Sequence, residues 1–542
     1  MKIRALTLCV VGALGASGGA FSMRPATPAA PATPAVPAAP ATPATPAAPA
    51  APAAPATPAA PARPARPDGW SGPWKSQQSE ARSLVKGRRV SLANGTGDVT
   101  VEVASGDELV ATARIEYGST DEEWMARVAS EFKLAMTEGA QEIHLKAEVP
   151  QLSRTFGRVR VSYSVKVTLR VPRGTALEIE NAYGDVTVAG IAGALEVRNS
   201  SGNISARGAV GPVVLDCKYG DVSVDGVEGA LEASGQSGRV TVKHVQGDAQ
   251  VTAAYGDARI EDVRGSLRLR AGSGAVVLAR IGGRVDAEAR YGDLTLDVAG
   301  APVRLSASSG AVKVRNAAAT VDVRSSYGDV LVDQAGGAVT VAGSSGNVKI
   351  VGAGGGVRAE SSYGDVQVDD ARGDVVAATT SGGVTLARIG GRADVRSSYG
   401  AVRALKIGGG LKVNGSSSTV LAEGVGGPID IETSYGEVTL RGIGDAVAVR
   451  AQSGAVDLSG FTGKGLTARH SVDSSYGDIL VRWPKAADVG FHLDSPEGSV
   501  STDLAGTVRS AGSRRTVDRP TPPGGGELRL IASSGTITLR TE

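Results

Sequence analysis

The chain has 542 residues, of which 42% are hydrophobic and only 4% aromatic, and its formal net charge is +2 from 57 basic and 55 acidic residues. A chain of this length can bury a large core, which must be mainly aliphatic because only five Phe and four Trp are present. The balanced charge argues against a nucleic-acid partner, and no run of 18 apolar residues follows the N-terminus, so we expect no transmembrane helix once a signal is removed.

Residues 1–22 have the features of a secretory signal peptide. Lys2 and Arg4 precede an apolar run over residues 5–16, and small residues follow it. We expect cleavage after Ala20 or Ser22. The sequence therefore predicts an exported protein that resides in the periplasm, on the cell surface or outside the cell.

Residues 23–69 form a linker rich in Pro, Ala and Thr. Proline recurs at every third position from Pro25 to Pro67. Because polyproline II has three residues per turn, these prolines would line one edge of an extended rod. At about 3.1 Å per residue the run reaches roughly 135 Å, which suits a spacer that crosses an envelope layer or holds the folded part away from a surface.

Residues 70–175 lack the repeat that follows and are expected to cap it. The acidic N-cap signal at residues 119–123 predicts an amphipathic helix over about 120–137, with Trp124 and Phe132 on its apolar face. Such a unit would cover the hydrophobic end and the open strand edges of a first coil; a ligand groove under the helix is the alternative. Alternating apolar residues predict strands at 90–92, 99–103, 109–115, 142–149 and 158–171.

Residues 176–542 are dominated by an internal repeat of 36 residues. A Tyr-Gly pair marks each repeat, and a Ser-Gly pair such as Ser201 and Gly202 lies midway, so the elementary unit has 18 residues. The repeat becomes irregular from about residue 459, a loop is expected at about 505–526, and residues 532–539 recover the pattern. The tyrosines are Tyr183, Tyr219, Tyr255, Tyr291, Tyr327, Tyr363, Tyr399 and Tyr435, followed after 41 residues by Tyr476.

The 18-residue unit predicts an all-β fold. Apolar residues alternate after the Tyr-Gly pair, as at Val186 and Val188, and again after a glycine-rich corner, as at Leu195 and Val197. Each unit therefore reads as one coil with two or three short strands, in a parallel β-solenoid whose coils lie about 4.8 Å apart. A hexapeptide β-helix is rejected because it needs an apolar residue every six positions, where this chain has Arg198.

The tyrosines are expected to form a structural ladder. Residues 195, 197 and 199 are expected to point inward, and the tyrosines occupy the next position in this alternation. Each ring should therefore pack at a corner of the core between the serines of the adjacent coils. Rings on alternate coils would be roughly 9.5 Å apart, beyond the distance of about 4.5–7 Å at which aromatic rings interact. A surface aromatic stripe that binds a sugar or a partner is the alternative.

An acid follows most Tyr-Gly pairs and is expected to cap the corner. The glycine would adopt an unusual backbone angle, and the carboxylate would accept hydrogen bonds from neighbouring amides. Acids on alternate coils are too far apart to share Ca²⁺, and their uniformity argues against a local active site. The predicted corner caps are Asp185, Asp221, Asp257, Asp293, Asp329 and Asp365.

No pattern in the sequence predicts a catalytic residue, a cofactor or a metal. The four histidines are scattered and have no Cys, Asp or Glu at ligand spacing. Cys217, the one cysteine left after signal removal, falls in a column of small inward residues with Asn199 and Ala253. We therefore expect it to be buried and to serve only as packing.

Three stretches, at residues 167–172, 176–180 and 184–188, together carry a family resemblance. A strand that ends in Val171 and Pro172, followed by repeated Gly-x-Val-x-Val coils, resembles the bacterial adhesin-like β-strand-repeat family over residues 88–542. That family consists of exported proteins of largely unknown function and is related in pattern to the head domains of autotransporter adhesins. The resemblance implies the solenoid fold and offers no catalytic residues.

Taken together, these features predict an exported, non-enzymatic β-solenoid that acts as an adhesin or as a scaffold of the envelope or surface. Its partner would be a surface glycan or a protein. The alternative is a β-helix protein that binds or cleaves polysaccharides with the acidic face of its coils. The sequence does not predict the oligomeric state.

Overall fold

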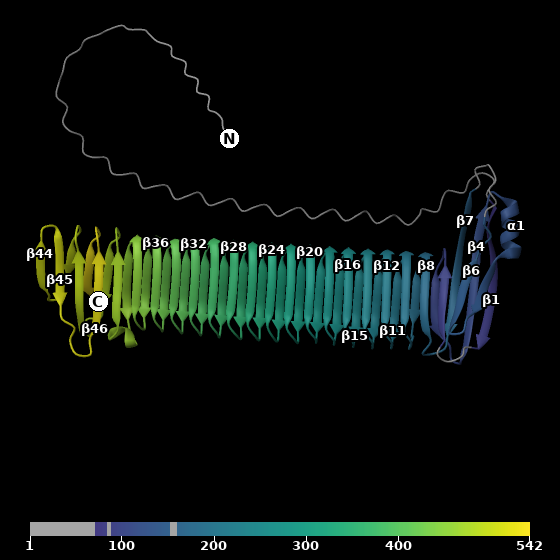
Figure 1. The fold of residues 1–542 in the computed structure, drawn as a ribbon, viewed down its shortest axis with the longest axis horizontal. Coiled ribbons are helices and arrows are strands. Elements are labelled where there is room, and N and C mark those ends of the chain that lie inside the picture. The colour runs from purple at the N-terminus through teal and green to yellow at the C-terminus, as the bar shows by residue number, and fades with distance from the viewer. Residues whose placement is uncertain (1–70, 84–87, 152–159) are drawn as a thin grey trace, which may run out of the picture. The chain divides into compact units, whose positions relative to one another are not determined.

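A computed structural model describes residues 71–83, 88–151 and 160–542, all within one compact unit. The predicted signal peptide and the proline-rich linker lie outside these residues. In the described part, the chain is all β apart from one α-helix and one short 3₁₀ helix. Its main body is a parallel β-solenoid whose strands stand side by side in one long row (Figure 1).

Each regular coil contributes one strand to each of two parallel sheets. The first coil contains β8 (Ala176–Tyr183) and β9 (Val186–Ala189), and the second contains β10 (Leu195–Ser201) and β11 (Ile204–Ala209). From β10 and β11 up to β38 (Val447–Ser453) and β39 (Val456–Phe461), each even strand has seven residues and each odd strand has six, and equivalent strands of successive coils begin 18 residues apart. These sixteen coils run without an insertion, which confirms the predicted solenoid and its 18-residue period.

The core lies between the two sheets and is built from six columns of side chains. In the second coil the inward residues occupy positions 195, 197 and 199 of β10 and positions 204, 206 and 209 of β11, and all six are buried. The residues between them face solvent because successive side chains of a strand point to opposite sides. Coils pair in register, so that Leu195 lies between Leu177 and Val213. Equivalent aliphatic residues therefore stack along the whole solenoid.

The N-terminal end does not follow chain order. A coil made of β2 (Arg89–Asn94) and β3 (Val99–Val103) lies between the β8–β9 coil and one made of β6 (Glu142–Glu148) and β7 (Val161–Val171). Antiparallel strands then cover the end: β5 (Lys133–Glu138) pairs with β6, β4 (Glu108–Ser119) with β7, and β1 (Ser71–Ser83) with β4. They protect the solenoid from pairing with a further parallel strand.

The helix of the capping segment is shorter than the sequence indicates. α1 spans Glu122–Glu131, and the chain then enters β5, so the helix expected up to residue 137 ends six residues early. Pairing of residues 133–138 with β6 outweighs their helical pattern. Asp121 caps the helix by accepting a 3.0 Å hydrogen bond from the backbone N–H of Trp124. The Trp124 side chain is buried, and its Nε1 donates to the carbonyl oxygen of Pro150 at 3.0 Å.

The C-terminal end repeats the same departure from chain order. The last coil along the chain consists of β46 (Gly526–Ala532) and β47 (Ile537–Thr541), and it lies between two earlier coils. One of these consists of β40 (Arg469–Ser474) and β41 (Ile479–Trp483), and the other of β42 (Val489–Ser495) and β43 (Val500–Thr502). The region expected to be a loop at about 505–526 contains a hairpin of β44 (Thr507–Ala511) and β45 (Arg514–Arg519). β45 pairs antiparallel with β42 and so covers this end of the sheet. The 3₁₀ helix, η1 (Gly463–Leu466), precedes this region.

Candidate functional site

The Tyr-Gly and Ser-Gly pairs lie where the chain turns from an even strand into the next odd strand. The glycines there have positive φ, for example 120° at Gly184 and 141° at Gly220. A Cβ atom on Gly220 would lie 2.2 Å from the carbonyl oxygen of Gly202 in the preceding coil. Only glycine permits both this conformation and this approach of two backbones.

The acids after these glycines bind the backbone of the next coil. Each carboxylate of the predicted corner caps accepts a hydrogen bond from the amide nitrogen 18 residues further on, which ties neighbouring coils together at the corner. The pairs are Asp185 with Asn203 at 2.7 Å, Asp221 with Arg239 at 2.7 Å, Asp257 with Ala275 at 3.0 Å, Asp293 with Ala311 at 2.9 Å, Asp329 with Asn347 at 2.8 Å and Asp365 with Gly383 at 2.7 Å.

The tyrosines lie on the surface of this corner, so their expected inward packing was wrong. Tyr183 is 57% exposed, Tyr435 is 54% exposed and Tyr476 is 68% exposed. Tyr219, Tyr255 and Tyr399 are also exposed, whereas Tyr291, Tyr327 and Tyr363 are half-buried. The alternation in register is as the sequence indicates, because Tyr219 pairs with Ser201 on one side and Ser237 on the other. We call this row of side chains the tyrosine edge.

The narrow inner corner explains why the rings point outward. The inward position two residues before each tyrosine holds a small side chain, such as Cys217 before Tyr219 and Ala253 before Tyr255, and both are fully buried. Backbones approach so closely at the following glycines that no volume remains for a phenol ring. Cys217 is free and packs as predicted; burial raises the pKa of its thiol to about 12.

A kink at the C-terminal end of each odd strand was missed by the sequence analysis, which predicted only the glycine-rich corner that follows it. One position at this end of the odd strand has positive φ throughout the regular coils, including non-glycine residues such as His244 at 53°, Arg280 at 56° and the exposed Val298 at 60°. The signal that could have revealed it is the glycine at this position in other coils, such as Gly190 and Gly208. Left-handed backbone at a β-branched residue such as Val298 is strained, and the stacked coils on either side must hold it.

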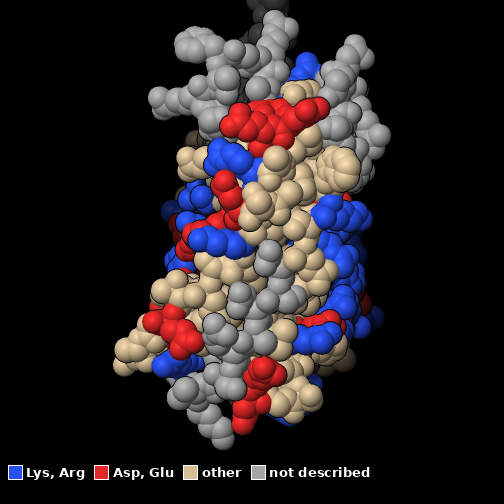
Figure 2. Space-filling model, turned by 90° about the vertical axis from the view of Figure 1, so that its right-hand side faces the viewer, with Lys and Arg blue, Asp and Glu red and all other residues tan. Residues whose placement is uncertain are grey.

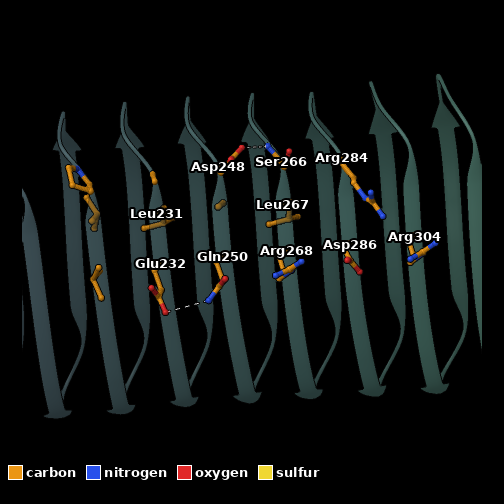
Figure 3. Close-up of a pocket in the computed structure, with 15 residues that line it drawn as sticks. Leu231, Glu232, Asp248, Gln250, Ser266, Leu267, Arg268, Arg284, Asp286 and Arg304 are labelled. Carbon is orange, nitrogen blue, oxygen red and sulfur yellow. Dashed lines mark hydrogen bonds between the residues drawn. The ribbon is translucent and has the colours of Figure 1, made fainter.

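The outer face of the even strands carries a shallow depression of about 680 Å³. Figure 3 shows Arg268, Asp286 and Arg304 in a row on neighbouring strands β18 (Leu267–Ser273), β20 (Val285–Tyr291) and β22 (Val303–Ser309). Glu232 accepts a 3.4 Å hydrogen bond from Gln250 in the same depression. Basic and acidic groups thus alternate here and do not form a site of one charge.

The capped end likewise has mixed charge. Figure 2 shows acidic and basic side chains interspersed on this face. Among the residues that the structure describes, no group of His, Cys, Asp and Glu could hold a metal ion. Within the same residues, no helix is long and apolar enough to cross a membrane.

The stacked coils and their corner define a β-solenoid repeat protein with an exposed, repetitive edge. The chain belongs to the Toastrack DUF4097 family, whose model matches residues 88–334 and 371–540. Among solved structures, a "putative cell adhesion protein" from Clostridium sporogenes is similar, with 6% identity, 86% of this chain and 100% of that chain covered, and a TM-score of 0.10. No curated protein matches the chain.

Proposed function

We propose that the protein is an exported, non-enzymatic solenoid that acts as an adhesin or as a scaffold of the cell envelope. The tyrosine edge is the observation that carries this proposal. It exposes an aromatic ring on every second coil over the regular array, and six of its nine rings are more than a third exposed. Aromatic side chains that remain exposed in a row mark interaction surfaces, since a tyrosine offers both an apolar face and a hydroxyl group.

The corner carboxylates support a structural role over a catalytic one. Asp185, Asp257 and Asp329 all hold a backbone amide of the next coil in the same way. A glycosidase needs one pair of carboxyl groups whose surroundings differ from each other, whereas the six predicted corner caps all make the same bond to the next coil. The polysaccharide-cleaving alternative therefore ranks below binding.

Export is tested by expressing the full chain in bacteria and sequencing the N-terminus of the protein recovered from the medium or released from intact cells by osmotic shock. The proposal expects an N-terminus at Phe21 or Met23, since cleavage is predicted after Ala20 or Ser22. Full-length protein confined to the cytoplasm would contradict export.

Binding is tested by probing the mature protein against a glycan array and a panel of extracellular-matrix proteins, with a heat-unfolded sample as control. Retention that requires the folded protein is expected for at least one ligand class. Release of new reducing ends from a polysaccharide panel would instead favour the enzymatic alternative.

A further inference from the structure

The tyrosine edge changes in chemistry along the solenoid. In the eight even strands from β22 to β36 (Ile429–Tyr435), the last two residues of every strand are Ser, Thr or Tyr. The pairs begin with Ser308 and Ser309 and end with Ser434 and Tyr435, so all sixteen side chains carry a hydroxyl group and none is charged. We call this part of the molecule the hydroxyl edge.

The N-terminal half of the same edge differs at the first of these two positions. There, only one of the seven even strands from β8 to β20 has a hydroxyl residue at this position, while the tyrosines and serines of the second position continue unchanged. The seven residues are Ala182, Ser200, Lys218, Gln236, Ala254, Gly272 and Arg290. The two halves therefore have the same backbone and the same rings. They differ in the side chains that border those rings.

The hydroxyl groups at the first position are available to a ligand. Ser308, Ser326, Ser344, Ser362 and Thr380 are exposed, and none of them has a hydrogen-bond partner among the described residues. Because neighbouring strands are about 4.8 Å apart, these groups form a ladder at that spacing. Beside it, the tyrosines repeat at roughly 9.5 Å, which is twice the strand spacing.

We propose that the hydroxyl edge binds a neutral, extended polysaccharide that lies along the solenoid axis. A pyranose ring presents a face of C–H groups that can pack on Tyr399 or Tyr435, and its hydroxyl groups can exchange hydrogen bonds with the ladder. The sixteen side chains of the hydroxyl edge are uncharged, and the exposed carboxylates that follow its tyrosines, such as Asp329 and Asp365, would repel an acidic polymer, so a neutral one is favoured. In an extended polysaccharide, every second sugar unit presents the same face to one side of the chain. This repeat matches the tyrosine rings, which occur on every second coil.

This inference rests on the proposed function and is tested by co-sedimentation of the mature protein with insoluble cellulose and chitin. Acidic pectate and alginate gels serve as comparisons. The variant Y327A/Y363A/Y399A/Y435A removes the rings of the hydroxyl edge. The comparison variant, Y183A/Y219A/Y255A/Y291A, removes four rings from the same column in the other half. The control is V214A, which shortens an exposed apolar side chain of β12 (Val213–Tyr219) away from the tyrosine edge.

We expect the first variant to bind at least one neutral polysaccharide about tenfold more weakly or worse, and the comparison variant to lose less affinity for that polysaccharide. V214A should remain within about twofold of the unmodified chain. A third variant, S326K/S362K/S398K, places charges in the ladder at outward positions and should also lose binding. Thermal unfolding of each variant shows that the loss does not come from misfolding.

Equal loss in both tyrosine variants, or stronger binding to the acidic gels, would overturn the inference. Failure of the unmodified protein to bind any neutral polysaccharide would also overturn it. If that same protein still binds a ligand on the glycan or matrix panels, the adhesin proposal survives and only the assignment of the hydroxyl edge is lost.

Discussion

The side-chain amide of Asn94 donates a 3.0 Å hydrogen bond to Oδ1 of Asn181, a residue 87 positions further along the chain. Asn181 in turn donates to Oδ1 of Asn199 at 3.2 Å and to the carbonyl oxygen of Gly184 at 3.0 Å. All three asparagines are buried. They form a ladder that joins the β2–β3 coil to the first two coils of the regular array.

Replacing Asn181 by Ala should therefore loosen the N-terminal end. It removes the donor to Oδ1 of Asn199, which is left buried without a partner at a cost of about 1–3 kcal/mol. The Asn94 amide loses one acceptor but keeps the carbonyl oxygens of Gly97 and Val165. Hydrogen exchange of β2 and β8 measures the effect, because a repeat array opens locally. Asn414→Ala, at an outward position, is the control, and equal exchange in both variants would contradict the ladder.

Replacing Val330 by Asp should open the solenoid in its middle. Val330, in β25 (Val330–Ala335), is buried between Val312 and Val348, so the carboxylate would be buried without a partner and cost more than about 4 kcal/mol. Lys349→Asp, on the exposed side of the next odd strand, should change stability by about 0.5 kcal/mol or less. Thermal unfolding compares them, and an equal loss would mean that the inward and outward columns are misassigned.

Replacing Gly310 by Ala should be more costly than replacing another positive-φ glycine that lies in open space. At Gly310, φ is +112°, and a Cβ atom would lie 2.2 Å from the carbonyl oxygen of Gly292. At Gly512, φ is +64° and nothing lies within 4 Å, so only the backbone strain of about 1–2 kcal/mol applies. In chemical denaturation, the Gly310→Ala variant should unfold at a clearly lower denaturant concentration than the Gly512→Ala variant. Similar midpoints for the two variants would show that the backbone at the corner can relax.

Replacing Asp293 by Ala should weaken one corner, whereas Asn should restore it. The Asp293 carboxylate accepts a 2.9 Å hydrogen bond from the Ala311 amide, and loss of such a bond costs about 1–3 kcal/mol. The Oδ1 atoms of Asn203 and Asn347 already accept the equivalent bond from the backbone N–H groups of Asp221 and Asp365, at 2.8 Å and 3.0 Å. Hydrogen exchange of the Ala311 amide measures the effect; no rescue by Asn would mean that the charge is essential.

The C-terminal end should lose stability as the pH falls below about 6.5. His470 is buried against Phe461 and Trp483, and its Nε2–H donates to the Gly465 carbonyl at 2.8 Å. Burial lowers the pKa of His470 from its ordinary value of 6.5. The unfolded chain therefore binds a proton that the folded chain does not, which destabilises the fold by up to about 1.4 kcal/mol per pH unit below 6.5.

Urea unfolding at pH 7.5 and 5.5 measures this pH dependence. His470→Gln keeps a donor for Gly465 but cannot titrate, so the difference between the two pH values should shrink in this variant. His144→Gln changes an exposed histidine and should leave the difference as it is. A difference that persists unchanged in His470→Gln would assign the pH dependence to other groups.

The amino-acid sequence by itself determined the repeating part of this protein. The 18-residue period, the two strands marked by Val186 and Leu195, and the buried place of Cys217 all follow from short-range alternation and from side-chain size. These properties repeat in sixteen coils, so the inward or outward assignment of each position rests on many equivalent residues. The corner glycines are recognisable for the same reason.

Only the tertiary structure decided how the ends are closed and which way the tyrosines point. No local pattern indicates that the β2–β3 coil lies beside a coil 87 residues further along the chain, although residues 97–101 and 184–188 share the sequence Gly-Asp-Val-Thr-Val. Nor does any local pattern indicate that the β46–β47 coil lies between two earlier coils. Strand parity sends Tyr183 inward, but the closely stacked backbones at Gly184 and Gly202 leave no room for a ring, so it turns to solvent. Residues 133–138 carry a helical pattern, yet they become a strand because β6 offers them hydrogen bonds that an isolated segment lacks.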